Sequence, residues 1–403
     1  MAKIDEYIPI VGQSTIDDLK LLAERLKGKV VQHINSTSVG GGVAEILNRM
    51  VPLLREVGVD TRWDLIKGGE QFFEVTKKIH NALHGRLDTV NRQDIDIFME
   101  TSKKNIEEVN TSSDIVFIHD PQPIALIDKK ATNKWIWRCH VDVSNPSQEV
   151  WDFLMGFISR YDAAVFSAPS FSRVMPIRQF LISPSIDPLS DKNKDLSDET
   201  INEVLEKYGI FRDKPIITQI SRFDRLKDPI GVIEAYLKVK KYIDCQLILA
   251  GGTASDDPEG LQVLEEVKER AQQDKDMHIL LLPQNDIEVN ALQRASDVIV
   301  QKSIKEGFGL TVAEALWKAK PVVASNIGGI PLQIKHRYSG LLCNSIDGAA
   351  FAIKQLLNSQ EYAKKLGENG REHIKNNFLV TRHIRDYLLL FLSLYHQEDV
   401  VYL

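Results

Sequence analysis

The amino-acid sequence predicts an α/β protein built from two Rossmann-like domains. At 403 residues the chain is too long for one ordinary hydrophobic core, which favours two domains of about 200 residues each. Short apolar segments alternate with stretches of helical apolar spacing, as in a parallel sheet covered by helices on both faces. Hydrophobic residues make up 43% and charged residues 26% of the chain, a balance typical of globular proteins.

Two series of predicted strands define the domains. In the first domain, residues 1–183, strands are predicted at 30–34, 63–66, 115–119, 135–139, 163–166 and 180–182, and helices at 43–57, 72–83 and 95–109. A segment rich in proline and serine, 183–195, forms the break before the second domain, residues 184–375. Its strands are predicted at 215–220, 246–250, 278–282, 298–301, 321–324 and 341–343, with helices at 200–208 and 311–317 and between most of these strands. The stretch 371–403 is predicted to be largely helical.

Composition excludes several classes of function. A formal net charge of −6 gives no reason to expect nucleic acid or an anionic membrane as a partner. The three cysteines are isolated, which favours a reducing compartment over a disulfide framework or a zinc site. The N-terminus lacks the apolar region of a signal peptide, and no window approaches the ~18–20 apolar residues of a membrane span. We therefore expect a cytoplasmic protein.

The most informative segment is residues 301–315, where a strand, a glycine turn and a helix follow one another. The N-terminus of such a helix attracts anions, because unpaired N–H groups and the helix dipole both point toward the turn. Gly307 and Gly309 leave the backbone open to close approach. Glu306 precedes the turn and Glu314 follows it, so two acids flank a phosphate-binding backbone. This layout suits a nucleotide sugar, in which a hexose and a ribose flank a diphosphate.

A second group of charges follows the first strand of the second domain. Cleavage of a sugar–diphosphate bond leaves negative charge on the leaving group, and fixed cations stabilise that transition state. Arg222 and Lys227 are candidates for these cations, whereas a solvated cluster of charges is the alternative. Ligands of open α/β sheets bind beyond the carboxyl ends of strands, where both this loop and Glu306 are expected.

The Glu-x7-Glu segment resembles the signature of retaining glycosyltransferases of the GT-B fold, the family that includes sucrose synthases and bacterial glycogen synthases. The resemblance implies two Rossmann-like domains facing each other across a cleft, with residues 376–403 forming a helix that crosses back to the first domain. It implies that Glu306 contacts the transferred sugar and that Arg222 and Lys227 stabilise the leaving diphosphate. Glu314 is expected to hold the ribose. Further donor contacts are expected at Gly41, Gly42, Leu282, Gly307, Phe308, Gly309, Leu310 and Thr311.

Polar residues also follow the strands of the first domain. A lone histidine is usually structural, but His140 fits the family position at which a histidine faces the sugar. Asp142 could orient His140 or bind a substrate. Asp120 and Gln122 could bind acceptor hydroxyls, although turn chemistry explains them equally well. No metal site is predicted, because no His-Glu-x-x-His pattern is present.

Longer strings at 72–83, 119–123, 137–142 and 183–190 resemble the trehalose synthases that transfer glucose from a nucleoside diphosphate glucose, such as UDP- or ADP-glucose, to free glucose. The resemblance implies those two substrates and a retaining reaction, with a homodimer as one possible assembly. No cofactor is required by the sequence, although Mg²⁺ could act as a counter-ion of the diphosphate. Three alternatives stay open: a related glucosyltransferase with another acceptor, a trehalose phosphorylase, and a nucleotide-binding module without activity.

Overall fold

The computed structural model describes residues 3–39, 42–85, 89–252, 258–272, 274–282 and 285–396. The chain divides into two compact units, which are described separately. Unit 1 consists of Met1–Ser185 together with Val380–Leu403, and unit 2 consists of Ile186–Leu379. The chain therefore leaves unit 1 for unit 2 and returns to unit 1 for its last helix.

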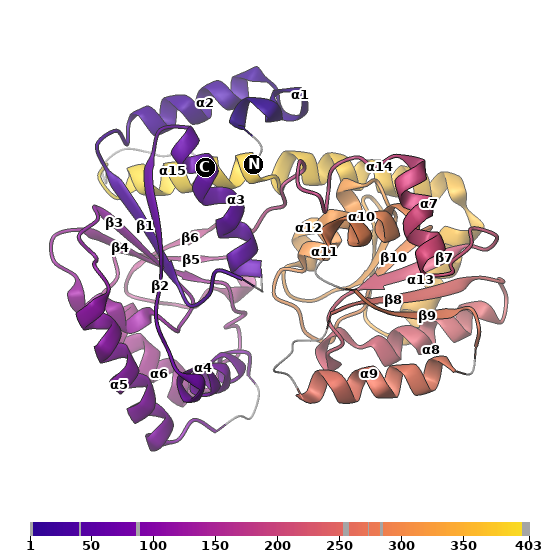
Figure 1. Ribbon diagram of the computed structural model, residues 1–403, viewed down its shortest axis with the longest axis horizontal. Coiled ribbons are helices and arrows are strands. Elements are labelled where there is room, and N and C mark those ends of the chain that lie inside the picture. Colours follow the sequence, from indigo (N-terminus) through magenta and orange to yellow (C-terminus); the bar gives the residue numbers. More distant parts are fainter. Residues whose placement is uncertain are drawn as a thin grey trace. The chain divides into compact units, whose positions relative to one another are not determined.

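Unit 1 is built on one parallel sheet of six strands (Figure 1). The strands are β1 (Val30–Asn35), β2 (Asp60–Leu65), β3 (Ile115–His119), β4 (Lys134–Cys139), β5 (Ala163–Phe166) and β6 (Arg178–Leu181), in the order β2-β1-β3-β4-β5-β6. The helices are α1 (Ile8–Val11), α2 (Gln13–Glu24), α3 (Gly42–Glu56), α4 (Glu70–Leu83), α5 (Arg92–Glu108), α6 (Gln148–Ile158) and α15 (Val380–Ser393). Because the order reverses between β1 and β3, ligands are expected at their carboxyl ends.

Unit 2 repeats this arrangement with its own parallel sheet. Its strands are β7 (Ile216–Ile220), β8 (Gln246–Gly251), β9 (Met277–Leu281), β10 (Val298–Gln301), β11 (Val322–Ser325) and β12 (Leu341–Cys343), in the order β12-β11-β10-β7-β8-β9. The helices are α7 (Asp198–Lys207), α8 (Pro229–Lys240), α9 (Pro258–Ala271), α10 (Asp286–Ala295), α11 (Leu310–Trp317), α12 (Ile330–Gln333), α13 (Ile346–Asn358) and α14 (Gln360–Asn377). Here the order reverses between β7 and β10.

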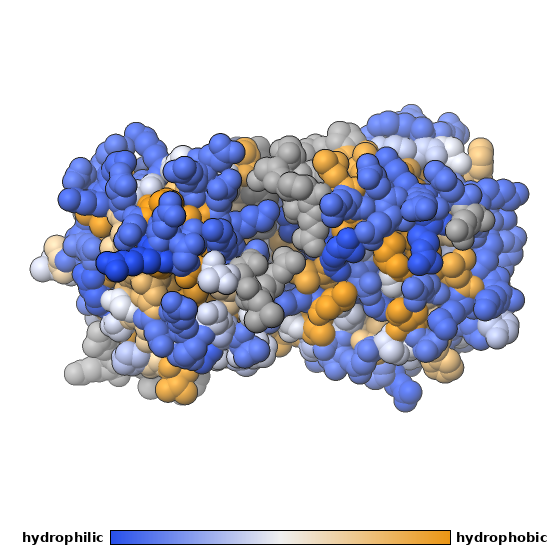
Figure 2. Space-filling model, turned by 90° about the horizontal axis from the view of Figure 1, so that it is seen from below, coloured by the Kyte–Doolittle hydropathy of each residue, from blue (hydrophilic) through white to orange (hydrophobic). Residues whose placement is uncertain are grey.

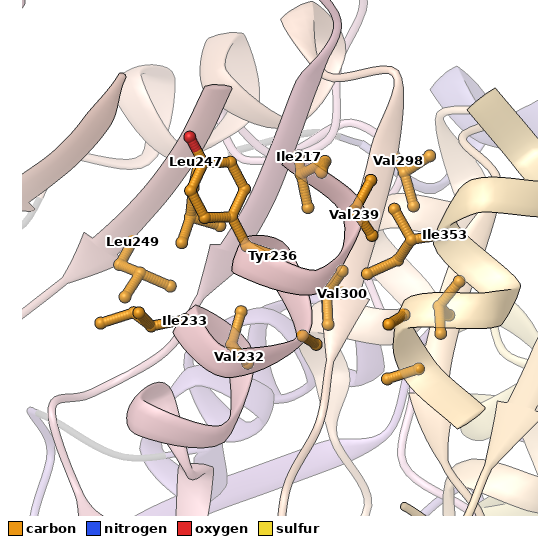
Figure 3. Packing of buried hydrophobic residues seen from close by; sticks show 14 of the residues in the cluster. Ile217, Val232, Ile233, Tyr236, Val239, Leu247, Leu249, Val298, Val300 and Ile353 are labelled. Carbon is orange, nitrogen blue, oxygen red and sulfur yellow. The ribbon is translucent and has the colours of Figure 1, made fainter. Parts of the chain in front are cut away.

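The core of unit 2 shows why its strands are apolar throughout. Leu247 and Leu249 of β8 point to the face covered by α8 and α13, where they belong to one buried cluster with Tyr236 of α8 and Ile353 of α13 (Figure 3). Ile248, between the two leucines, belongs to the cluster on the opposite face, beneath α7 and α10. Both faces of β7, β8, β10 and β11 are buried, so these strands lack a regular period-two alternation of polar and apolar residues.

The predicted strands and helices are confirmed, with shifts of at most three residues at the ends of the segments for which bounds were predicted. In unit 1, helices α1, α2 and α6 were not among the predictions. The face shown in Figure 2 is mostly hydrophilic, and its apolar side chains lie in small separate groups. Within the described ranges, no helix combines the length and the apolar character that a membrane span needs.

Candidate active site

The turn between β10 and α11 depends on close approach of two backbone segments. Gly309 has a φ of 77°, and Gly328, from the loop after β11, has a φ of 57°. A Cβ atom on Gly328 would lie 2.0 Å from the carbonyl oxygen of Glu306. The amide of Gly329 donates to the carbonyl of Gly307 at 2.7 Å. Glycine is therefore required at 328 both for its conformation and for space, and this contact fixes the turn that carries Glu306.

Glu306 is nearly buried at 8% exposure, and polar side chains surround its carboxylate. The ammonium of Lys227, in the loop after β7, lies 2.7 Å from each carboxylate oxygen. Ser303 donates its hydroxyl to Oε2 at 3.0 Å, and Gln301 donates to the same oxygen at 3.4 Å. A buried carboxylate is costly unless a cation and hydrogen bonds compensate it. The two strands beside the order reversal of the sheet thus bring the predicted acid and cation into direct contact.

The loop carrying Lys227 is held by its own acidic residues. Asp224 accepts the amide of Leu226 at 2.7 Å and caps the short 3₁₀ turn Arg225–Lys227. Asp228 has a left-handed backbone (φ 50°), caps α8 through the amide of Gly231 and forms an ion pair with Lys302. The end of β10 is thereby tied to the loop after β7, which fixes the direction of Lys227.

Arg222, the other predicted cation, is exposed. Its guanidinium lies 3.6 Å from Asp224, with 60% of the side chain accessible. Arg225, in the same loop, forms a paired contact with Glu266 at 2.7 and 3.2 Å. Both guanidinium groups are exposed, but that of Arg225 is held by Glu266, whereas Arg222 makes the longer contact with Asp224.

Helix α11 begins at Leu310, with Gly309 as its first flanking residue. None of the described side chains caps this end with a hydrogen bond, so its first amides face the turn. Thr311 in the first turn donates its hydroxyl to the side-chain oxygen of Gln301 at 3.2 Å. Phe308 is buried against Phe378, with ring centroids 5.5 Å apart. The predicted donor-binding segment is thus a helix N-terminus on a rigid, packed turn.

Glu314 lies further along α11 and is 2% exposed. One carboxylate oxygen lies 3.7 Å from the ammonium of Lys192. Lys318, one turn later, donates to the carbonyl of Glu314 at 3.2 Å and to Asn193 at 3.1 Å. Burial lowers the pKa of Lys318 to about 7, while Glu314 opposes that shift. Leu282, one of the predicted donor contacts, is buried after β9, and its amide donates to the carbonyl of Gly251 at 3.0 Å.

In unit 1, His140 follows β4 and joins a chain of three histidines. Its Nε2 lies 3.1 Å from Nδ1 of His119, and Nε2 of His119 lies 3.0 Å from Nδ1 of His33. Burial lowers the pKa of His33 to about 3 and lowers the pKa values of His119 and His140 well below the usual range. All three rings are therefore neutral at physiological pH.

The acidic candidates of unit 1 have structural partners. Asp120, with a φ of 64°, accepts the backbone amide of His140 at 2.9 Å. Burial raises the pKa of this carboxyl to about 6. Asp142 accepts the amide of Ser144 at 2.9 Å, and it and Gln122 are half-buried. The partner of Nε2 of His140 is His119, and the role of Asp142 as an orienting partner or a substrate contact stays a prediction.

The glycine loop after β1 is only partly described. Gly42 is exposed and begins α3, whereas Gly41 lies outside the described residues. Within those residues, no group of three or more histidine, cysteine, aspartate or glutamate side chains is arranged to hold a metal ion.

Sequence reasoning missed His33 and the role of His119. Each lies on a strand beside the order reversal in unit 1, and residue 33 is in register with residue 117. His119 lies two residues after Phe117 on β3, so its side chain points to the same face of the sheet as that of His33. A histidine within the apolar run at 30–34 was the available signal.

Two family models match the chain. Residues 33–173 match the model described as trehalose synthase, N-terminal domain, and residues 200–373 match the model described as glycosyl transferases group 1. The first match covers the histidine chain, and the second covers the turn at Glu306 and the loop at Lys227.

Relatives extend the similarity over nearly the whole chain. A trehalose synthase of Thermococcus litoralis is 44% identical over 394 residues, and one of Rubrobacter xylanophilus is 43% identical over 403 residues; each match covers 96% of both chains. A trehalose phosphorylase of Grifola frondosa is 28% identical over 93% of this chain and 58% of its own length. Among solved structures, an α,α-trehalose-phosphate synthase (UDP-forming) from Burkholderia xenovorans has a TM-score of 0.74 at 13% identity, covering 91% of this chain and all of that one. That last likeness is one of fold, the GT-B glycosyltransferase fold.

Proposed function

The chain belongs to the trehalose synthase family of glycosyltransferases, and on that premise we propose that it transfers glucose from a nucleoside diphosphate glucose to free glucose, forming trehalose. The observation that carries this proposal is the contact between Lys227 and Glu306 beside the N-terminus of α11. A cation, a carboxylate and free helical amides are the groups that a diphosphate and a sugar need side by side.

Donor binding exchanges the partners of this ion pair. The diphosphate binds Lys227 and the exposed Arg222, and hydroxyls of the transferred glucose donate hydrogen bonds to the carboxylate of Glu306. The amides from Gly307 to Thr311 bind the diphosphate, and Glu314 accepts the ribose hydroxyls. The buried surroundings of Glu306 strengthen these contacts, because water competes less there than at the surface.

The reaction keeps the α configuration of the donor. The bond between C1 of glucose and the diphosphate oxygen breaks, and its electron pair leaves with the diphosphate. The hydroxyl of the acceptor attacks C1 from the same face and gives its proton to the departing phosphate oxygen. Arg222 and Lys227 stabilise the charge that develops on the leaving group, so we expect no obligatory metal ion, and Mg²⁺ at most assists as a counter-ion.

The acceptor is proposed to be an uncharged hexose. The described parts of the loops after β1, β3 and β4, residues 35–39, 119–123 and 140–145, contain no lysine or arginine. Arg138, the nearest arginine in sequence, is fully buried and donates to Ser167 at 3.2 Å and to the carbonyl of Phe166 at 3.4 Å. A phosphorylated sugar would need fixed cations there, whereas a free hexose needs hydroxyl partners such as Gln122 and Asp142.

Competition kinetics test this function. UDP-glucose and ADP-glucose are offered in turn, with glucose and glucose 6-phosphate as competing acceptors. We expect trehalose as the main product and a higher kcat/KM for glucose than for glucose 6-phosphate. A far higher kcat/KM for the phosphorylated sugar would refute the acceptor assignment.

A phosphorylase is the second candidate, because a trehalose phosphorylase also aligns with 93% of the chain. Its reaction uses inorganic phosphate and no nucleotide, so it leaves Glu314 without a ribose to bind. Incubating trehalose with phosphate alone, and then with UDP or ADP, separates the two reactions. Sugar release with phosphate alone would favour the phosphorylase, and tight nucleotide binding without any transfer would favour a binding module.

A further inference from the structure

Three imidazole rings in unit 1 form a continuous chain from the sheet interior to the loop after β4. The chain runs from His33 in β1, through His119 at the end of β3, to His140. His33 and His119 are 0% and 2% exposed, and aromatic rings enclose the inner end. The ring of Phe117 lies 5.2 Å and that of Tyr387 lies 6.4 Å from the ring of His33.

The protons on the ring nitrogens can be arranged in two ways along this chain of neutral histidines. Because each neutral imidazole carries one N–H, each of the two hydrogen bonds needs one protonated nitrogen and one bare nitrogen. If the bonds run outward, His33 donates from Nδ1, His119 donates from Nδ1, and His140 is left with a proton on its own Nδ1. If they run inward, His140 has a bare Nδ1 and the last proton lies on Nε2 of His33.

The inner end decides between the two arrangements. Nε2 of His33 is buried, and within the described ranges it has no hydrogen-bond partner. The inward arrangement would place an N–H group at that position, whereas the outward arrangement places a bare lone pair there. Orphaned buried N–H groups are rarer in proteins than under-satisfied acceptors, so the outward arrangement is favoured.

We propose that His119 and His33 are positioning residues that hold His140 neutral, with its proton on Nδ1, so that it presents an N–H donor to a hydroxyl of the bound hexose. This inference rests on the proposed transferase function. It makes His140 a hydrogen-bond donor rather than a proton acceptor. His33 and His119 would then act through His140 and not by touching a substrate.

Other titratable groups around the chain must be separated from it. Asp120 accepts the backbone amide of His140 and has a pKa raised by burial to about 6, so it titrates near the physiological range. Substitution of Asp120→Asn removes that titration and keeps an oxygen that can accept the amide. Further charged or titratable neighbours include Arg138 and Cys139 on β4, Asp142 after it, and Arg382, His383, Asp386 and Tyr387 on α15.

Nitrogen-15 NMR of protein labelled at histidine reads the tautomer directly. We expect the shift of a protonated Nδ1 and a bare Nε2 for His140, assigned by comparison with His140→Gln, and no titration of this ring between pH 5 and 8. A bare Nδ1, or titration of the ring within this range in both wild type and Asp120→Asn, would overturn the proposal. This readout needs no activity, so it stands apart from a failure of the proposed function.

Matched variants connect the tautomer to turnover. His33→Leu removes the donor to His119, whereas His33→Asn keeps an N–H near the position of Nδ1. We expect kcat to fall about tenfold in His33→Leu with little change in KM, and His33→Asn to retain the wild-type kcat. Phe117→Leu controls for lost packing, since it removes an aromatic neighbour and leaves both hydrogen bonds. Equal losses of kcat in all three variants would show a structural role only and would refute the proposal.

Discussion

Acid should destabilise unit 1 through the burial of His33. Its pKa is lowered from 6.5 to about 3, so between these values the unfolded chain binds a proton that the folded chain does not. The free energy of unfolding contributed by this residue is therefore complete above pH 6.5 and is lost as the pH falls toward 3. At pH 5 the unfolded state gains about RT ln(1 + 10^1.5), or about 2 kcal/mol, relative to the folded state.

Asp120 has the opposite effect on stability to His33, because acid stabilises the folded state through its carboxyl group. The effect of His33 must therefore be measured as a difference between two proteins. The carboxyl pKa of Asp120 rises from 3.8 to about 6, so the folded state binds the extra proton between these values and gains about 1 kcal/mol between pH 7 and pH 5. The wild-type profile alone therefore mixes both effects with those of the buried His119 and His140, whose pKa values are also lowered. The difference between wild type and His33→Asn isolates the histidine, because Asp120 is common to both proteins.

Urea unfolding followed by tryptophan fluorescence measures this difference. Four of the five tryptophans lie in unit 1, so a Trp317→Phe background restricts the signal to that unit. We expect the wild type to lose about 2 kcal/mol more than His33→Asn between pH 7 and pH 5. Both His33→Asn and His33→Leu should show this smaller loss, although only the leucine variant should lose turnover. Equal losses in wild type and both variants would refute the burial argument.

Three further predictions concern unit 2. Lys227→Ala and Glu306→Ala should each lower glucosyl transfer by about 10³-fold or more while circular dichroism stays unchanged; rates within a few-fold of wild type for both would rule out the donor site. Gly328→Ala should lower transfer at least about tenfold because its Cβ meets the carbonyl of Glu306, whereas Gly209→Ala, equally left-handed but in open space, should cost only about 1 kcal/mol of stability and no activity. Glu314→Gln should raise the KM for the donor about tenfold, and this penalty should vanish with a donor that lacks the ribose hydroxyls; the same penalty with both donors would contradict a ribose contact.

The strands could be predicted because each is a short run of apolar residues bounded by turns. Helix α2 was missed for a physical reason: its buried positions Ile16, Leu19 and Ala23 pack in part against α15, which lies more than 350 residues later in the chain. A helix that precedes the first strand also lies outside the alternation of strands and helices that indicated the fold.

The candidate site likewise contains features that are local in the sequence and features that depend on the fold. Glu306 and its glycines are contiguous in the sequence, so their chemistry could be inferred before any fold was known. The contact between Lys227 and Glu306 joins residues 79 positions apart, and the chain from His33 to His119 spans 86. Both contacts exist because β7 lies beside β10 and β1 lies beside β3, and apolar periodicity does not encode which strands are neighbours.

The order of strands also explains why these particular pairs carry the chemistry. In each sheet, successive crossovers run to opposite sides of one strand, β1 in unit 1 and β7 in unit 2, so the loops that follow two adjacent strands diverge there. That divergence leaves room for a ligand where side chains from both loops can meet. Lys227 and Glu306 come from one such pair of strands, and the histidine chain begins at the other. Leu282, after β9, lies away from that order reversal and is packed into the protein, so we expect its substitution to alter nucleotide affinity without changing the rate of the chemical step.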